Sequence, residues 1–232
     1  MGTSIRDKRI WELDFFRGIA LILMIYFHIV FDMKDIFDYN VIYSSGINYY
    51  LGKISAILFM LLSGVSCYLS RSNIRRGVKV LGIAMIITVA THLYSPELGV
   101  KFGILHFLGV CMLIAPLFQK LNRYMLLVLG TGSIILGNYF SGTTVSHDYL
   151  FVFGIYSEKF VSSDYYPLFP WIGIFMYGMA VGQIFYSNRK SIFNFTMGGN
   201  FISKAGRHTL VCYVLHQPLI LLILTLVNQL FR

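Results

Sequence analysis

Charge is scarce in this sequence: charged residues make up 12% of its 232 residues, and only ten residues are acidic. A soluble domain carries about 25% charged residues, and a disordered chain combines low hydrophobicity with high net charge. Both classes are therefore excluded. Cysteine is also rare, and the three cysteines lie singly inside apolar runs, so neither a disulfide framework nor a zinc site is expected.

Long apolar runs are what the sequence has instead. Hydrophobic residues make up 56% of the chain, and its mean hydropathy is +0.68. Because ~20 apolar residues cross a bilayer as a helix, we expect an all-α, polytopic transmembrane helical bundle. The alternating segments of a β-barrel are absent. Seven spans are expected: Phe15–Met33, Ile54–Ser70, Val78–Tyr94, Phe102–Phe118, Met125–Phe140, Leu168–Tyr186 and Thr209–Leu230.

The fifth of these runs is the weakest prediction, because it is short and holds three glycines. A re-entrant hairpin is the alternative at this place. The connections between the runs are all short, so residues 1–14 are expected as a cytoplasmic segment and residues 15–230 as a single transmembrane domain.

The distribution of basic residues predicts the orientation. With the N-terminus inside, the inner segments hold 14 of the 19 basic residues and the outer segments hold five. Cytoplasmic loops of membrane proteins carry such an excess, so we expect a cytoplasmic N-terminus and an external C-terminus. The same rule explains the basic balance without nucleic acid as a partner. The expected location is a cell membrane, of bacterial type.

Ionisable residues inside the apolar runs are candidates for function, because they are costly in lipid. Arg17 and His28 lie eleven residues apart in the first run. Eleven residues are almost three helical turns, so both side chains share one face about 16 Å apart. Asp32 follows His28 by four residues and can orient its imidazole. Snorkelling of Arg17 to headgroups and packing of His28 are the structural alternatives.

Further polar residues lie at both ends of the predicted bundle. The inner loop Arg71–Lys79 contains Arg75 and Arg76 and is either an anion site or an ordinary positive-inside signal. His106 lies in the outer part of the fourth run, and Asp164 lies in an aromatic outer stretch. Those two residues are candidates to contact a polar substrate.

Several motifs resemble those of transmembrane acyltransferases. The stretch Leu13–Ala20, running on to His28, resembles the opening of these enzymes, with the R-x10-H spacing of the acyltransferase-3 group. Later motifs resemble the catalytic domain of heparan-alpha-glucosaminide N-acetyltransferase and its small bacterial relatives. They are Gly103–Phe107 and Pro167–Gly173. The closing stretches Gly206–Thr209 and Tyr213–His216 also resemble the last helix of both families.

The resemblance implies an acyl-CoA-dependent acyltransferase that takes an acyl group, usually acetyl, from cytoplasmic acyl-CoA. The acceptor would be a sugar amine or hydroxyl, of a carbohydrate or glycoconjugate, on the other side of the membrane. Membrane lipids are the remaining expected partners, a homo-oligomer stays open, and no metal is expected. The resemblance and the spacing together assign roles to eight residues: His28 as base or acyl carrier, Asp32 as its orienting partner, Arg17, Arg75, Arg76 and Arg207 as CoA ligands, and His106 and Asp164 on the acceptor side.

At one point this chain departs from the lysosomal N-acetyltransferase that it resembles. The proposed active histidine of that enzyme lies in the first extracytoplasmic loop, whereas the corresponding loop of this chain, Lys34–Lys53, contains no histidine. Two alternatives of other classes remain. One is a proton-coupled transporter or flippase that uses His28 and Asp32, and the other is a structural membrane subunit. Binding of coenzyme A would separate an acyltransferase from both.

Overall fold

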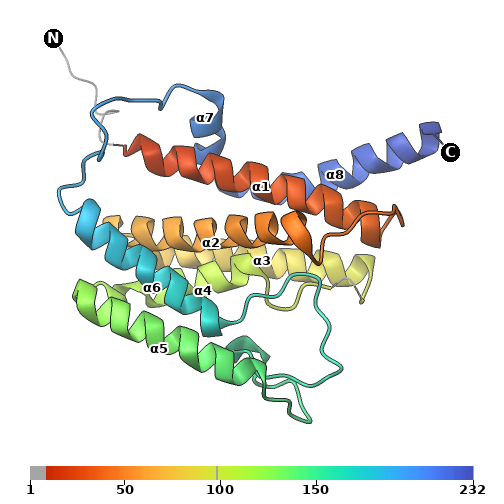
Figure 1. Cartoon of the computed structure of the whole chain (residues 1–232), viewed down its shortest axis with the longest axis horizontal. Coiled ribbons are helices and arrows are strands. Elements are labelled where there is room, and N and C mark those ends of the chain that lie inside the picture. Colours follow the sequence, from red (N-terminus) through yellow and green to blue (C-terminus); the bar gives the residue numbers. More distant parts are fainter. Residues whose placement is uncertain (1–8, 98, 232) are drawn as a thin grey trace. The chain divides into compact units, whose positions relative to one another are not determined.

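A computed structural model describes residues 9–97 and 99–231 of the chain (Figure 1). The described residues form α-helices, with isolated bridges and no strand, and the longest connection runs from the end of α5 at Ser141 to the start of α6 at Leu168. Six helices are long and apolar enough to cross a membrane, and a shorter apolar helix accompanies them. The all-α, multi-pass class predicted from the sequence is confirmed. The helices are α1 Trp11–Asp35, α2 Gly46–Leu69, α3 Asn73–Tyr94, α4 Ile104–Phe118, α5 Arg123–Ser141, α6 Leu168–Phe185, α7 Phe201–Arg207 and α8 Thr209–Phe231, with a short 3-10 turn η2 at Phe151–Phe153.

The weak span is the fourth and not the fifth. Helix α5 is continuous over 19 residues, whereas α4 has 15 residues. Two glycines of α5 mark close helix contacts: a Cβ on Gly130 would lie 3.1 Å from the Gly173 carbonyl oxygen, and one on Gly137 would lie 2.5 Å from Pro170. Both contacts are with α6. The glycines therefore serve packing, and the hairpin alternative is wrong.

Helix α1 begins at Trp11, earlier than the predicted span. Its first turn therefore includes Glu12 and Asp14, both almost fully buried. Acidic side chains are favourable there, because the first turn carries the positive end of the helix dipole. Arginines from two helices, Arg17 on α1 and Arg207 on α7, converge on Asp14.

The described chain divides into two compact units, and the division falls within α2. In the first unit, which continues from Arg189 to the C-terminus, α1 packs against α7 and α8. The backbones of α1 and α7 touch at glycines. A Cβ on Gly18 would lie 2.1 Å from the Ile202 carbonyl oxygen, and one on Gly206 would lie 1.8 Å from the Asp14 carbonyl oxygen. Larger side chains at these two positions would force the helices apart.

The second unit, Met60–Asn188, pairs α3 with α4 and α5 with α6 (Figure 1). Its helix ends are tied by side-chain amides. Asn73 Nδ2 donates to the Cys67 carbonyl at 2.8 Å, and Gln119 Nε2 donates to the same carbonyl at 2.7 Å. Gln183 Nε2 donates to the Leu121 carbonyl at 2.8 Å. These bonds bring the C-terminal ends of α2, α4 and α6 to one end of the unit, together with the starts of α3 and α5.

Candidate active site

Three arginines surround one buried carboxylate at the start of α1. Arg9 Nε lies 2.6 Å from Asp14 Oδ2, Arg17 Nη1 lies 2.8 Å from Asp14 Oδ1, and Arg207 Nε lies 3.5 Å from Asp14 Oδ2. The Asp14 side chain is 1% exposed, whereas those of Arg9 and Arg207 are 55% and 38% exposed. We call Arg9, Arg17 and Arg207 the arginine mouth. One carboxylate cannot neutralise three guanidiniums, so the mouth keeps a net positive charge that suits an anion.

Helix α7 holds Arg207 at this mouth. Asn200 caps α7 by accepting a bond from the Ser203 N–H at 2.7 Å, and the Arg207 Nη2 donates to the Gly198 carbonyl at 2.7 Å. The missing side chain of Gly206 allows the α7 backbone to approach Asp14. The sequence predicted Arg17 and Arg207 as anion ligands. It did not identify Arg9, or Asp14 as the group that gathers them, although Asp14 stands one turn before Arg17.

The connection that leads to α7 is also anchored to α1. Glu12 Oε1 accepts a bond from the Ile192 N–H at 2.8 Å, and the Trp11 ring packs against Phe193 and Phe195, with centroids 5.8 and 5.5 Å away. Glu12 is 1% exposed. This anchoring fixes the segment from which Arg207 is presented.

Two histidines lie next to each other, one further along α1 and one on α8. The rings of His28 on α1 and His216 on α8 lie 4.8 Å apart between centroids. The Nδ1–H of His216 donates to the Tyr213 carbonyl, which leaves its Nε2 as a lone-pair acceptor. That Nε2 and the Nδ1 of His28 are buried and have no hydrogen-bond partner among the described residues. Buried polar atoms are nearly always bonded, so these two nitrogens, on rings 4.8 Å apart, are candidates to bond a polar ligand.

Asp32 and Gln217 fasten the two helices next to this pair. The fully buried Asp32 carboxylate accepts from Gln217 Nε2, at 2.8 Å to Oδ1 and 2.9 Å to Oδ2. The Gln217 Oε1 is buried and has no partner among the described residues. The bonds of Asp32 thus go to Gln217, the neighbour of His216 in sequence. Sequence reasoning did not single out Gln217, although an amide directly after a histidine inside an apolar run is a usable signal.

His106 and Asp164, both predicted on the acceptor side, meet at the start of α4 in the second unit. His106 Nδ1 accepts from the Gly103 N–H at 3.2 Å, and its Nε2–H donates to Thr88 Oγ1 at 3.1 Å, because the Thr88 hydroxyl itself donates to the Val100 carbonyl. Both ring nitrogens are therefore occupied, and the ring is held as the neutral Nε2–H tautomer. His106 has no lone pair left for a substrate proton in this arrangement.

Asp164 accepts a bond from the Ile104 N–H at 3.0 Å. Burial raises the pKa of its carboxyl to about 6, although the Ile104 bond lowers it. A Cβ on Gly103 would lie 2.1 Å from the Asp164 Oδ2, so only glycine permits this bond. The carboxylate satisfies an N–H at the first turn of α4, which has no partner within the helix.

Arg75 and Arg76 lie in the first turn of α3 and not in the predicted loop, because α3 begins at Asn73. The buried Asn73 amide starts the helix early by bonding back to α2. Arg75 is exposed and Arg76 is half-buried. Both belong to the second unit, whereas Arg17 and Arg207 belong to the first. Among the described residues, no group of three histidine, cysteine or acidic side chains could hold a metal ion.

The fold and these sites define a class: a multi-pass membrane protein with buried polar groups among its apolar helices. The family described as heparan-alpha-glucosaminide N-acetyltransferase, catalytic, matches residues 9–218, and the chain belongs to this family. The protein is therefore a membrane acetyltransferase. The match includes the arginine mouth and ends two residues beyond His216. No curated protein and no solved structure matches the chain.

Proposed function

We propose that this enzyme transfers an acyl group, acetyl in the first instance, from cytoplasmic acyl-CoA to an amine or hydroxyl of a sugar or glycoconjugate outside the membrane. The observation that carries the proposal is the His28–His216 pair, in which His28 Nδ1 and His216 Nε2 are buried and have no partner in the part of the chain that the structure describes. His28 of this pair lies on α1, the helix that also carries Arg17 of the arginine mouth. In this assignment residues 15–230 act as a single catalytic domain behind the cytoplasmic segment 1–14.

The arginine mouth is proposed to bind the phosphates of the donor. Guanidinium groups bind phosphate through strong, charge-assisted and often bidentate hydrogen bonds. Arg17 and His28 are separated by eleven residues of continuous helix, or about 16 Å along the axis. A donor held at the mouth by its phosphates can then extend its pantetheine arm toward the pair. Arg75 and Arg76 are proposed to make further phosphate contacts.

The histidine pair is proposed to carry the proton transfer. The amine nitrogen or hydroxyl oxygen of the acceptor attacks the thioester carbonyl, and the neutral imidazole of His28 takes the proton that this atom loses. The carbon–sulfur bond breaks, and the CoA thiolate receives the proton back from the imidazolium. His216 Nε2, an acceptor by its tautomer, shares the proton with His28 during the step. The net result is acylated acceptor and free CoA, and no further reactant is needed.

Asp32 is proposed as a positioning residue. Its carboxylate holds the Gln217 amide, and Gln217 adjoins His216, so the bond sets the register of α8 beside α1. Loss of the Asp32 charge should therefore lower kcat through the geometry of the pair. His106 and Asp164 are proposed to shape the acceptor side by holding the start of α4.

The decisive experiment compares His28→Ala with His147→Ala, an exposed histidine of the loop after α5. Loss of a general base costs about 10²–10⁴-fold in rate, so we expect that loss for His28→Ala and none for the control. Acyl-CoA affinity, measured by calorimetry on purified protein, should stay within a few-fold of wild type in both. An active His28→Ala enzyme would disprove the assignment of the base.

Sidedness needs a separate measurement. In oriented proteoliposomes, acyl-CoA supplied only on the cytoplasmic face should acylate an acceptor present only on the other face. Reaction only when both substrates share one side would refute transmembrane transfer and leave the acetyltransferase class intact. Failure of the wild-type protein to bind CoA at all would instead remove the donor assignment.

A further inference from the structure

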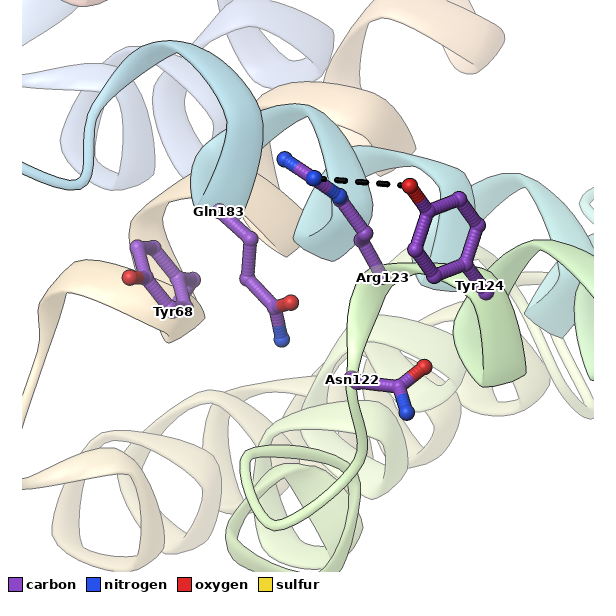
Figure 2. Close-up of a pocket in the computed structure, with 5 residues that line it drawn as sticks. All are labelled: Tyr68, Asn122, Arg123, Tyr124 and Gln183. Atoms are coloured by element: carbon purple, nitrogen blue, oxygen red, sulfur yellow. Dashed lines mark hydrogen bonds between the residues drawn. The ribbon is translucent and has the colours of Figure 1, made fainter.

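A cavity of about 400 Å³ lies at the end of the second unit where the side-chain amides tie the helices together. Figure 2 shows the five residues that line it: Tyr68 near the end of α2, Asn122, Arg123 and Tyr124 at the start of α5, and Gln183 near the end of α6. None of them has a role in the chemistry proposed above. The lining consists of one cation, two phenols and two amides, without a carboxylate.

The cavity presents hydrogen-bond donors. The Arg123 guanidinium lies 5.1 Å from the Tyr124 ring centroid and donates one long bond, 3.4 Å, to the Tyr124 hydroxyl. No described carboxylate forms an ion pair with Arg123. Asn122 uses its oxygen to cap α5, accepting from the Met125 N–H at 2.9 Å, so its NH₂ group remains a donor. Donors without a competing carboxylate select an anion.

The surroundings favour a lipid over a soluble anion. Tyr124, Val128 and Ile135 are spaced along one face of α5 and are 66%, 70% and 64% exposed. In a membrane protein this apolar face contacts acyl chains, and it begins at the rim of the cavity. The same end of the unit carries basic residues and no acidic ones, a pattern that attracts anionic headgroups. These basic residues are Arg71, Arg75, Arg76, Lys79, Lys120 and Arg123.

From the cavity, its donors and the adjoining apolar face, we propose that this is a binding site for an anionic phospholipid. The headgroup phosphate is held by Arg123 and the Asn122 amide, and one acyl chain lies along the exposed face of α5. A soluble phosphate compound offers the same phosphate chemistry but would leave that face unused. This site is independent of the acyl-transfer chemistry proposed above.

The test counts bound lipid on purified protein. The protein is reconstituted in nanodiscs of phosphatidylcholine with phosphatidylglycerol and extracted gently. The phosphatidylglycerol retained is then measured by native mass spectrometry. We compare Arg123→Gln with Arg71→Gln, which removes an exposed cation at the same end but outside the cavity. A charge-assisted bond contributes enough that Arg123→Gln should weaken phosphatidylglycerol binding about tenfold, whereas Arg71→Gln should bind as wild type does. Phosphatidylcholine should not be retained.

Two results would overturn the proposal. The first is equal retention of phosphatidylglycerol by Arg123→Gln and Arg71→Gln, which would show that lipid binding depends on the total positive charge of this end and not on the cavity. The second is displacement of the lipid by adenosine 3′,5′-bisphosphate in an Arg123-dependent way, which would give the cavity to a soluble nucleotide. If Arg123→Gln loses its helical circular dichroism, Asn122→Asp replaces it, because a carboxylate still accepts the capping bond from the Met125 N–H. That change replaces the NH₂ donor by an oxygen, so a weakening of a few-fold or more supports the site and unchanged binding refutes it.

Discussion

The contact between α1 and α7 can be tested by adding a single methyl group. In Gly206→Ala the new Cβ would lie 1.8 Å from the Asp14 carbonyl oxygen, whereas ordinary contacts begin near 3.4 Å. Helix α7 must therefore retreat by about 1.6 Å, the difference between those two distances. The backbone oxygen cannot rotate away as a side chain could. Overpacking of this kind costs about 1–3 kcal/mol, and sometimes more.

The displacement reaches the arginine mouth, because Arg207 follows Gly206 directly. Its Nε lies 3.5 Å from Asp14 Oδ2, near the limit of an ion pair, so a shift of that size breaks the contact. We expect Gly206→Ala to lower Tm by roughly 2–12 °C, since 1 kcal/mol corresponds to about 2–4 °C for a protein of this size. We also expect weaker acyl-CoA binding. Thermal unfolding in detergent and calorimetry measure the two effects.

The matched control is Gly132→Ala in α5, where nothing lies within 4 Å of the added Cβ. Alanine is favoured over glycine inside a helix by about 0.5–1 kcal/mol, so this variant should be as stable as wild type or slightly more stable. Wild-type stability of Gly206→Ala would refute the close backbone contact. Lower stability with unchanged acyl-CoA affinity would keep the contact and remove Arg207 from the phosphate ligands.

Three further predictions concern the buried groups and the orientation. His216→Ala should reduce turnover by at least tenfold at unchanged acyl-CoA affinity, and a fully active variant would leave His28 without a catalytic neighbour. The pKa of Asp164 is about 6 in the fold and near 4 in an unfolded chain. Between these two pH values the native state binds more protons than the unfolded state, so the free energy of unfolding should fall as pH rises from about 4 to 6. Asp164→Asn, which keeps an oxygen for Ile104, should flatten that slope in unfolding measured across this range, and an unchanged slope would assign it to another group. Reporter fusions after Arg76 should be cytoplasmic and fusions after Asp38 external, and the reverse result would invert the orientation.

The sequence was sufficient for the class of fold, because the cost of exposing polar backbone to lipid leaves few structures open to long apolar runs. It was less reliable for the ends of helices. Helix α1 extends to Trp11 and α3 to Asn73, since a buried acidic turn in one case and an amide bond in the other outweigh the apparent polarity of these segments. Such compensation depends on partners far away in sequence, which hydropathy does not report.

The candidate site was predictable only along a single helix. Spacing alone predicts Arg17 and His28 on one face of α1. Their partners come from α7 and α8, about 190 residues later in the chain. Asp32 illustrates the limit: four-residue spacing suggested His28 as its partner, but the bonds that the structure describes go to Gln217. Tertiary contacts of this kind follow from the packing of helices and not from local periodicity.

His106 and Asp164 differ from the histidine pair in how their hydrogen-bonding atoms are satisfied. His106 and Asp164 were both candidates by residue type, yet each has partners that account for its burial. His28, His216 and Gln217 keep buried atoms with no partner among the described residues, and each such atom costs about 1–3 kcal/mol. This free energy is recovered when a bound ligand supplies the missing hydrogen bonds. Because His216 Nε2 is an acceptor and Gln217 Oε1 can only accept, that ligand must bring N–H or O–H donors. The amine or hydroxyl proposed as the acyl acceptor carries such donors, and so do the amide groups of the pantetheine arm proposed to reach this pair. Both substrates of the proposed reaction can therefore supply the missing hydrogen bonds.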